Sequence, residues 1–150
     1  MRIIRISTLE YPELEPYRTL RGRTHHWKDG FFVAEGEKAI RALLASNLRV
    51  KSLLMNEDWL EALEGALRRG GTENSDVYVA GEALMEGIVG FPLHQKLLAI
   101  GEVPDNPPLE ALNDTARPRA VHVALEGIAD AENMGMILRN CAAFGAAGLL

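Results

Sequence analysis

From residue 31 onwards, short apolar runs alternate with amphipathic stretches along the chain. Apolar runs of about four to eight residues are typical of buried strands, and apolar positions three and four residues apart are typical of helices. The predicted strands span residues 31–36, 49–55, 76–80 and 96–103, and the predicted helices span residues 37–46, 56–70 and 81–88. The first thirty residues are less regular, with isoleucines that fit one short strand and prolines that bracket a turn or short helix. Alternating strands and helices predict an α/β fold.

The stretch from residue 56 to residue 70 carries both a start signal and a stop signal for a helix. Asn56 is a favourable N-cap, and the two acidic residues after it suit the positive end of the helix dipole. Three leucines form an apolar stripe, and Gly70 follows two arginines of the last turn. We therefore expect a well-bounded helix here.

A change of composition separates two parts of the chain. Residues 105–120 are rich in proline and poor in large apolar residues, which is typical of a linker. Beyond it, residues 121–127 form a predicted buried strand, residues 136–146 a helix and residues 148–150 the beginning of another strand. We therefore predict an α/β domain over residues 1–104, a linker over 105–120, and the beginning of a second domain over 121–150, incomplete at residue 150.

Composition and charge narrow the classes of function. Apolar residues make up 47% of the chain and charged residues 25%, which is usual for a globular domain. No apolar run is long enough for a membrane span and the charged amino end does not resemble a signal peptide, so we expect a soluble, cytoplasmic protein without a membrane partner. The single cysteine, Cys141, excludes an internal disulfide and a cysteine-built zinc site, and we predict no metal site. Because the net charge is −5, nucleic-acid binding requires a local basic patch.

A candidate ligand site lies at the start of the helix predicted after residue 135. Asn133 is a suitable N-cap, and Gly135 lets a ligand approach the backbone of the first turn. Arg139 lies in a helix whose other positions are nearly all apolar. Such a guanidinium either works at a site, extends to solvent, or pairs with Asp130 or Glu126, and the spacing alone leaves these alternatives open.

A second candidate is the basic segment 18–28, which reads RTLRGRTHHWK and contains no acidic residue. Cations suited to phosphates stand beside aromatic side chains suited to bases, which is typical of an RNA-binding surface. The candidate RNA-binding residues are Arg18, Arg21, Arg23, Trp27 and Lys28. The alternative is a solvated basic loop whose tryptophan packs on the edge of the domain.

The run of residues 126–145 is similar to a known motif. It reads E-G-x-x-D-x-x-N-x-G-x-x-x-R-N-x-x-x-F-G and resembles the first motif of SpoU-type (TrmH-like) RNA ribose 2′-O-methyltransferases, in the SPOUT class. Asn133, Gly135 and Arg139 match this motif residue by residue. The motif is far more specific than an isolated glycine pattern.

The resemblance extends upstream over most of the chain. Residues 31–55 resemble the small substrate-binding domain of these enzymes, which is akin to certain ribosomal proteins, and residues 90–104 resemble the segment that ends it. Two positions depart from the family pattern: Ala131 stands where the family often has proline, and Lys96 where it has glycine after H-Q.

The resemblance implies a fold and an activity. We expect a ribosomal-protein-like RNA substrate-binding α/β domain, a linker, and the start of a knotted SPOUT domain that is truncated at residue 150. The implied activity is S-adenosylmethionine-dependent 2′-O-methylation of RNA, with ribosomal RNA favoured over transfer RNA. The alternative from another class is a non-catalytic RNA-binding or ribosome-assembly module of the same fold.

The resemblance also assigns roles to the matched residues. Arg139 would stabilise the alkoxide that develops on the ribose oxygen, because an arginine side chain stays protonated at neutral pH. Asn133 would orient the arginine or the ribose, and Gly135 would allow close approach to the backbone. The family motifs that hold S-adenosylmethionine are not in this chain, so we expect it to be inactive alone and monomeric, whereas a complete chain would be a homodimer.

Overall fold

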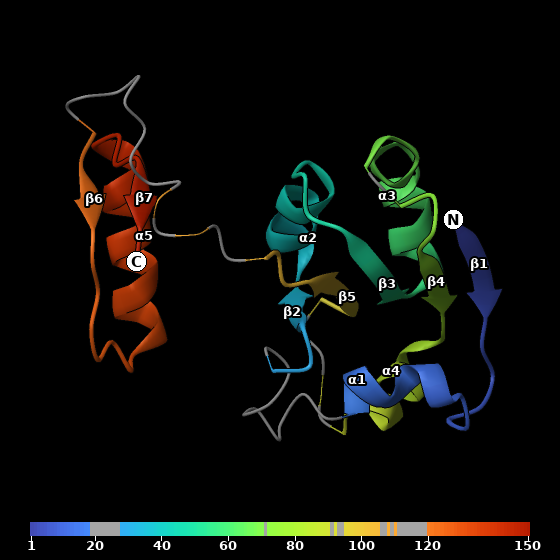
Figure 1. The fold of residues 1–150 in the computed structure, drawn as a ribbon. Coiled ribbons are helices and arrows are strands. Elements are labelled where there is room, and N and C mark those ends of the chain that lie inside the picture. Colours follow the sequence, from blue (N-terminus) through green and yellow to red (C-terminus); the bar gives the residue numbers. More distant parts are fainter. Residues whose placement is uncertain are drawn as a thin grey trace. The chain divides into compact units, whose positions relative to one another are not determined.

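The computed structural model describes residues 1–18, 28–70, 72–90, 92, 95–105, 108, 110 and 120–150 of the chain. The chain forms two compact units, Met1–Pro104 (unit 1) and Asp105–Leu150 (unit 2) (Figure 1). Most of the predicted linker lies outside the described residues. Within the described part of the chain, no helix is long and apolar enough to cross a membrane.

The α/β alternation predicted from the sequence is confirmed in unit 1. Each strand and helix expected between residues 31 and 103 is present, and its ends differ from the prediction by at most two residues. The elements are β1 (Arg2–Arg5), the 3₁₀ turn η1 (Pro12–Leu14), α1 (Glu15–Arg18), β2 (Phe31–Glu35), α2 (Glu37–Leu44), β3 (Val50–Met55), α3 (Glu57–Arg69), β4 (Asp76–Val79), α4 (Glu82–Val89) and β5 (Leu97–Glu102). As expected, Asn56 caps α3: its side chain accepts a hydrogen bond of 3.1 Å from the Trp59 N–H.

The five strands of unit 1 form one mixed sheet in the order β1-β4-β3-β5-β2. β1, β4 and β3 run parallel, whereas β5 lies antiparallel to both β3 and β2. Successive residues of a strand point to opposite faces, so the adjacent Leu53 and Leu54 of β3 belong to two separate buried clusters. α1 and α4 contribute to the cluster of Leu54, and α2 and α3 to that of Leu53. Unit 1 is therefore a helix–sheet–helix sandwich.

The start of α2 and the segment before β5 are joined by a hydrogen bond. Gly36 has a φ of +85°, and it cannot cap α2 with a side chain. Gln95, far along the chain, provides this cap, because its Oε1 accepts a hydrogen bond of 2.7 Å from the Glu37 N–H. Lys96 has a φ of +49° and is the one non-glycine with a positive φ among the described residues. The left-handed backbone gives a physical reason for the glycine that the family pattern has at this position.

Unit 2 contains fewer strand residues than the sequence predicts. Its elements are β6 (His122–Val123), α5 (Ala131–Ala143) and β7 (Gly148–Leu149). β6 and β7 pair in parallel, with His122 opposite Gly148 and Val123 opposite Leu149. The predicted strand over 121–127 is thus wrong in length, because β7 supplies only two partner residues for its ladder.

The described part of unit 2 is poorly packed, as we expect of one helix beside two strands, of which the second was predicted over only three residues. None of the described residues between 120 and 150 is buried, and Val121 and Phe144 are 62% and 88% exposed. Apolar side chains become buried only when further layers cover them, and one helix on a two-stranded ladder does not form such a core.

Candidate functional site

The start of α5 follows directly from local side-chain chemistry. Asp130 is its N-cap, and the Asp130 side chain accepts a hydrogen bond of 2.8 Å from the backbone N–H of Asn133. The prediction that Asn133 caps the helix is therefore wrong: Asn133 is the third helical residue and donates to the cap. The helix begins earlier than expected because the backbone geometry places the Asp130 carboxylate within hydrogen-bond distance of a free N–H group of the first turn. Glu132 adds a second acidic group at the positive end of the helix.

Gly135 and Arg139 lie together on α5. A Cβ at Gly135 would stand 3.5 Å from one terminal nitrogen of the Arg139 guanidinium and 4.0 Å from the other. The arginine side chain therefore extends back along the helix towards its first turns, as long helical side chains do. These distances are ordinary van der Waals contacts, so the guanidinium lies directly beside the position where a side chain at Gly135 would begin.

Arg139 makes no ion pair with Asp130 or Glu126 among the described residues, and it is exposed. The pairing alternative considered from the sequence is therefore not found. A cation placed towards the amino end of a helix gains nothing from the helix dipole, which favours anions there. A bound anion at this place would be stabilised by the guanidinium and by the helix end together.

The hollow beside α5 does not match the needs of S-adenosylmethionine. It measures about 290 Å³ and lies between β6 and α5, with Val121, Ile137 and Phe144 among its lining residues. Asn140 is its main polar side chain. Adenosine hydroxyls, an ammonium and a carboxylate need several polar partners, so the described residues do not form a site for this cofactor.

The basic segment is only partly described. The Arg18 guanidinium donates to the carbonyl oxygens of Leu9 and Tyr11 and pairs with Glu15 at 3.2 Å, and its side chain is 30% exposed. Arg18 therefore holds the amino-terminal segment together. Lys28 is exposed. The other candidate RNA-binding residues, Arg21, Arg23 and Trp27, lie outside the described residues.

Among the described residues there is no group of three or more His, Cys, Asp or Glu side chains that could hold a metal ion. His122 lies in β6, and its Nδ1 is buried without a hydrogen-bond partner among the described residues. Cys141 is half-buried and free.

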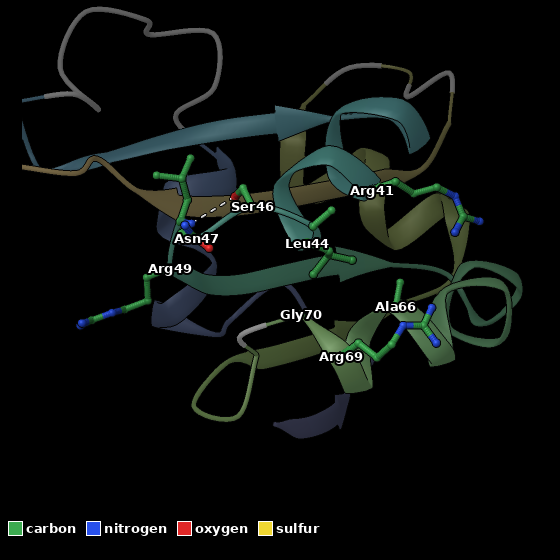
Figure 2. A pocket seen from close by; sticks show the side chains of 10 residues that line it. Arg41, Leu44, Ser46, Asn47, Arg49, Ala66, Arg69 and Gly70 are labelled. Carbon is green, nitrogen blue, oxygen red and sulfur yellow. Dashed lines mark hydrogen bonds between the residues drawn. The ribbon is translucent and has the colours of Figure 1, made fainter. Parts of the chain in front are cut away.

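Sequence reasoning missed a group of arginines in unit 1. Arg41, Arg49 and Arg69 line one hollow near the ends of α2 and α3 (Figure 2). The sequence does contain a signal for a local basic surface: residues 38–56 and 65–72 include no acidic residue, although the net charge of the chain is −5. The two stretches are separated by an acidic half-helix, so a scan for one continuous basic run does not join them.

Comparisons with known proteins agree with the motif. No family model matches the chain. It is 34% identical over 111 residues to an uncharacterized tRNA/rRNA methyltransferase of Mycobacterium tuberculosis, a match that covers 73% of this chain and 36% of that relative.

Solved structures show the same fold over nearly the whole chain. An AdoMet-bound rRNA methyltransferase from Sinorhizobium meliloti is 24% identical with a TM-score of 0.70, covering 98% of this chain and 53% of that one. The SpoU methyltransferase AviRb from Streptomyces viridochromogenes is 22% identical with a TM-score of 0.66, covering 93% and 50%. An RNA 2′-O ribose methyltransferase is 20% identical with a TM-score of 0.61, covering 97% and 54%.

The chain spans about a third of the length of the curated relative and about half of each solved chain. In sequence the chain is similar to a tRNA/rRNA methyltransferase, and in fold to a SpoU methyltransferase, which confirms the resemblance predicted from residues 126–145.

Proposed function

We propose that this chain is part of an S-adenosylmethionine-dependent RNA 2′-O-ribose methyltransferase that acts on ribosomal RNA. Its relatives and structural neighbours carry the names of tRNA/rRNA methyltransferases, and one neighbour is named as a 2′-O ribose enzyme. The residues of this chain would supply the RNA side of the reaction, since the described residues form no site for the cofactor.

The observation that carries the proposal is the close approach of the Arg139 guanidinium to Gly135 near the start of α5. Methylation of a ribose hydroxyl requires that the hydroxyl lose its proton while negative charge grows on its oxygen. Arginine is too weak an acid to shuttle this proton at neutral pH, but its fixed positive charge stabilises the oxygen and the neighbouring phosphate. Asn133, six residues before Arg139 on the same helix, would orient the ribose or the arginine.

Unit 1 and the segment 18–28 would bind the RNA substrate. A helix–sheet–helix sandwich with its own two cores is a rigid platform for this role. The complete enzyme would be a cytoplasmic homodimer, and the 150-residue chain a monomer. These roles follow from the family resemblance.

A chimera tests the activity. Residues 1–150 would replace the matched half of the Sinorhizobium meliloti enzyme, and tritium transfer from labelled S-adenosylmethionine to ribosomal RNA would be followed in single turnover. We expect methylation by the chimera, and its loss when Arg139→Ala is introduced, with RNA binding nearly unchanged. Arg68→Ala, an exposed helical arginine outside the motif, is the control and should leave the rate unchanged.

The product identifies the chemistry. A 2′-O-methyl group blocks alkaline cleavage at its nucleotide, so the label should appear in alkali-resistant dinucleotides, whereas a methylated base would release labelled mononucleotides. Activity of Arg139→Ala within about tenfold of the parent, or about 1.4 kcal/mol, would contradict the role of Arg139. RNA binding by a well-folded chimera without any methyl transfer would favour the non-catalytic module.

The 150-residue chain alone should not bind the cofactor. Its hollow beside α5 is small and mostly apolar, so isothermal titration with S-adenosylmethionine should give no measurable heat of binding. A dissociation constant in the micromolar range would contradict this expectation.

A further inference from the structure

A hollow of about 750 Å³ lies on unit 1 where α2 and α3 end. Ten residues line it, including three arginines and no aspartate or glutamate. The chain as a whole carries 21 acidic and 16 basic residues, so a hollow whose lining includes three guanidinium groups and no carboxylate differs from the average. This local excess of positive charge is the feature that nucleic-acid binding by an acidic protein requires.

The floor of the hollow is built from closely packed backbone. Gly70 ends α3 directly against α2, and a Cβ at Gly70 would stand 2.3 Å from the carbonyl oxygen of Leu44. Only glycine permits this approach. Leu44 and Ala66 lie between the arginine side chains in Figure 2. The hollow is therefore pre-formed by the packing of two helix ends, with apolar groups at its base.

The arginines reach the hollow from three different places. Arg41 extends from α2 and Arg69 from α3 on one side, while Arg49, from the loop before β3, extends on the other side (Figure 2). Ser46, in the same loop, donates a hydrogen bond of 2.7 Å to the Leu43 carbonyl and accepts one of 3.1 Å from the Leu48 N–H, which shapes the loop.

The positive charges remain available to a ligand. Arg69 is exposed and makes no ion pair with any described residue. Arg41 pairs with Glu37 at 2.8 Å and Arg49 with Glu102 at 3.4 Å, and the two arginine side chains are 45% and 77% exposed. Exposed pairs of this kind contribute little energy, so a phosphate competes with them readily.

We propose that this hollow binds the phosphate backbone of single-stranded RNA. The proposal rests on the proposed function, because it names a place on the substrate-binding unit where the RNA lies. Guanidinium groups bind phosphate oxygens in a two-pronged geometry, and the apolar floor suits the face of a base or ribose. Arg41, Arg49 and Arg69 each bind one phosphate, and Gly70 permits the close packing that forms the floor.

Salt-dependent binding tests the proposal. The 150-residue chain would be titrated into a fluorescently labelled oligouridylate of about ten nucleotides across a series of salt concentrations. The variant R41Q/R49Q/R69Q should bind more weakly, and its log–log slope should fall by roughly 2, at about 0.7 for each phosphate that is no longer neutralised. The matched control R2Q/R5Q/R68Q removes the same charge from arginines that pair with carboxylates elsewhere on unit 1, and its slope should stay unchanged.

The outcomes separate the two proposals. If the parent chain binds no RNA, both this inference and the RNA-binding role of unit 1 are wrong. If the parent binds but the two triple variants have equal slopes, the hollow is not the RNA site, while the proposed function stands.

Circular dichroism would reveal whether a triple variant fails to fold. In that case a second measurement, made on the parent chain, tests the proposal. The side-chain Nε–H signals of the arginines in the parent chain would be followed by NMR, and the Arg69 signal should move on addition of the oligouridylate. An unmoved Arg69 signal overturns the proposal. So does an equal shift with polyglutamate, which would identify the hollow as a site for an acidic protein partner.

Discussion

Units 1 and 2 are both built from strands and helices with apolar positions, yet these positions are buried in unit 1 and partly exposed in unit 2. In unit 1, Leu53 and Leu63 are fully buried between a sheet and a helix layer. In unit 2, Met136 and Leu138 remain 46% and 47% exposed although they lie on a regular helix. The comparison teaches that apolar periodicity determines which element forms, whereas burial depends on the number of layers that meet there.

The largest expected effect is the difference between two leucine truncations. Leu53→Ala should lower the free energy of unfolding of unit 1 by about 3 kcal/mol, because it leaves a cavity in a filled core. Leu138→Ala should change stability by less than about 0.5 kcal/mol, because that side chain is half-exposed. Urea unfolding followed by circular dichroism measures both, and equal costs would mean that unit 2 has a core comparable to that of unit 1.

The second largest expected effect on stability concerns the capping of α5. Asp130→Ala should destabilise α5 by about 1 kcal/mol through loss of the hydrogen bond to the Asn133 N–H. Asn133→Ala keeps that backbone N–H and should have little effect. Amide hydrogen exchange along α5 reports both variants, with the amides of β3 and β5 as an internal reference. A larger loss of protection in Asn133→Ala would restore Asn133 as the cap.

Replacing Lys96 by glycine should stabilise unit 1, because the backbone is left-handed at this position. Lys96→Gly removes a side chain from a residue with a φ of +49° and should raise the free energy of unfolding by up to about 1 kcal/mol. The ion pair that Lys96 makes with Glu82, in which the lysine side chain is 24% exposed, offsets part of this gain. Lys38→Gly, in the right-handed backbone of the first turn of α2, is the matched control and should lower stability by up to about 1 kcal/mol. A loss of stability in both variants would show that Lys96 is not strained.

The smallest effect concerns pH and is confined to unit 1. Arg2 donates two hydrogen bonds to Asp76, at 2.8 and 2.7 Å, and thereby lowers the pKa of the Asp76 carboxyl below its ordinary value. Its contribution to stability is complete above the ordinary aspartate pKa of about 4 and is lost as pH falls through the lowered folded-state pKa.

Asp76→Asn should therefore destabilise the protein at neutral pH by about 1 kcal/mol or less, and this difference should vanish in acid. Thermal melts of both proteins between neutral and acidic pH measure the difference. A constant difference across the whole range would rule out the carboxylate as its source.

Local chemistry explains why most of the fold was predictable. The cap at Asn56, the stripe of leucines after it and Gly70 are all near one another in sequence, and they bound α3 to within one residue. The identity of the motif residues Gly135 and Arg139 was equally visible, because a fixed spacing on one helix brings them together whatever the tertiary structure. The cap of α5 was missed because two residues, Asp130 and Asn133, both suit that role and only the backbone geometry chooses between them.

Other features depend on contacts between distant residues. Gln95 caps α2 from 58 residues away, and the sheet order places β5 between β3 and β2 in antiparallel pairing, so neither could be predicted from local patterns. The arginines at 41, 49 and 69 become neighbours only when the ends of α2 and α3 pack at Gly70. The sequence by itself determined the strands and helices of unit 1 and the spacing of the motif on α5, because these follow from backbone preference and periodicity over a few residues. Tertiary structure alone decided burial, distant capping and the basic hollow, because each requires side chains from separate elements to meet.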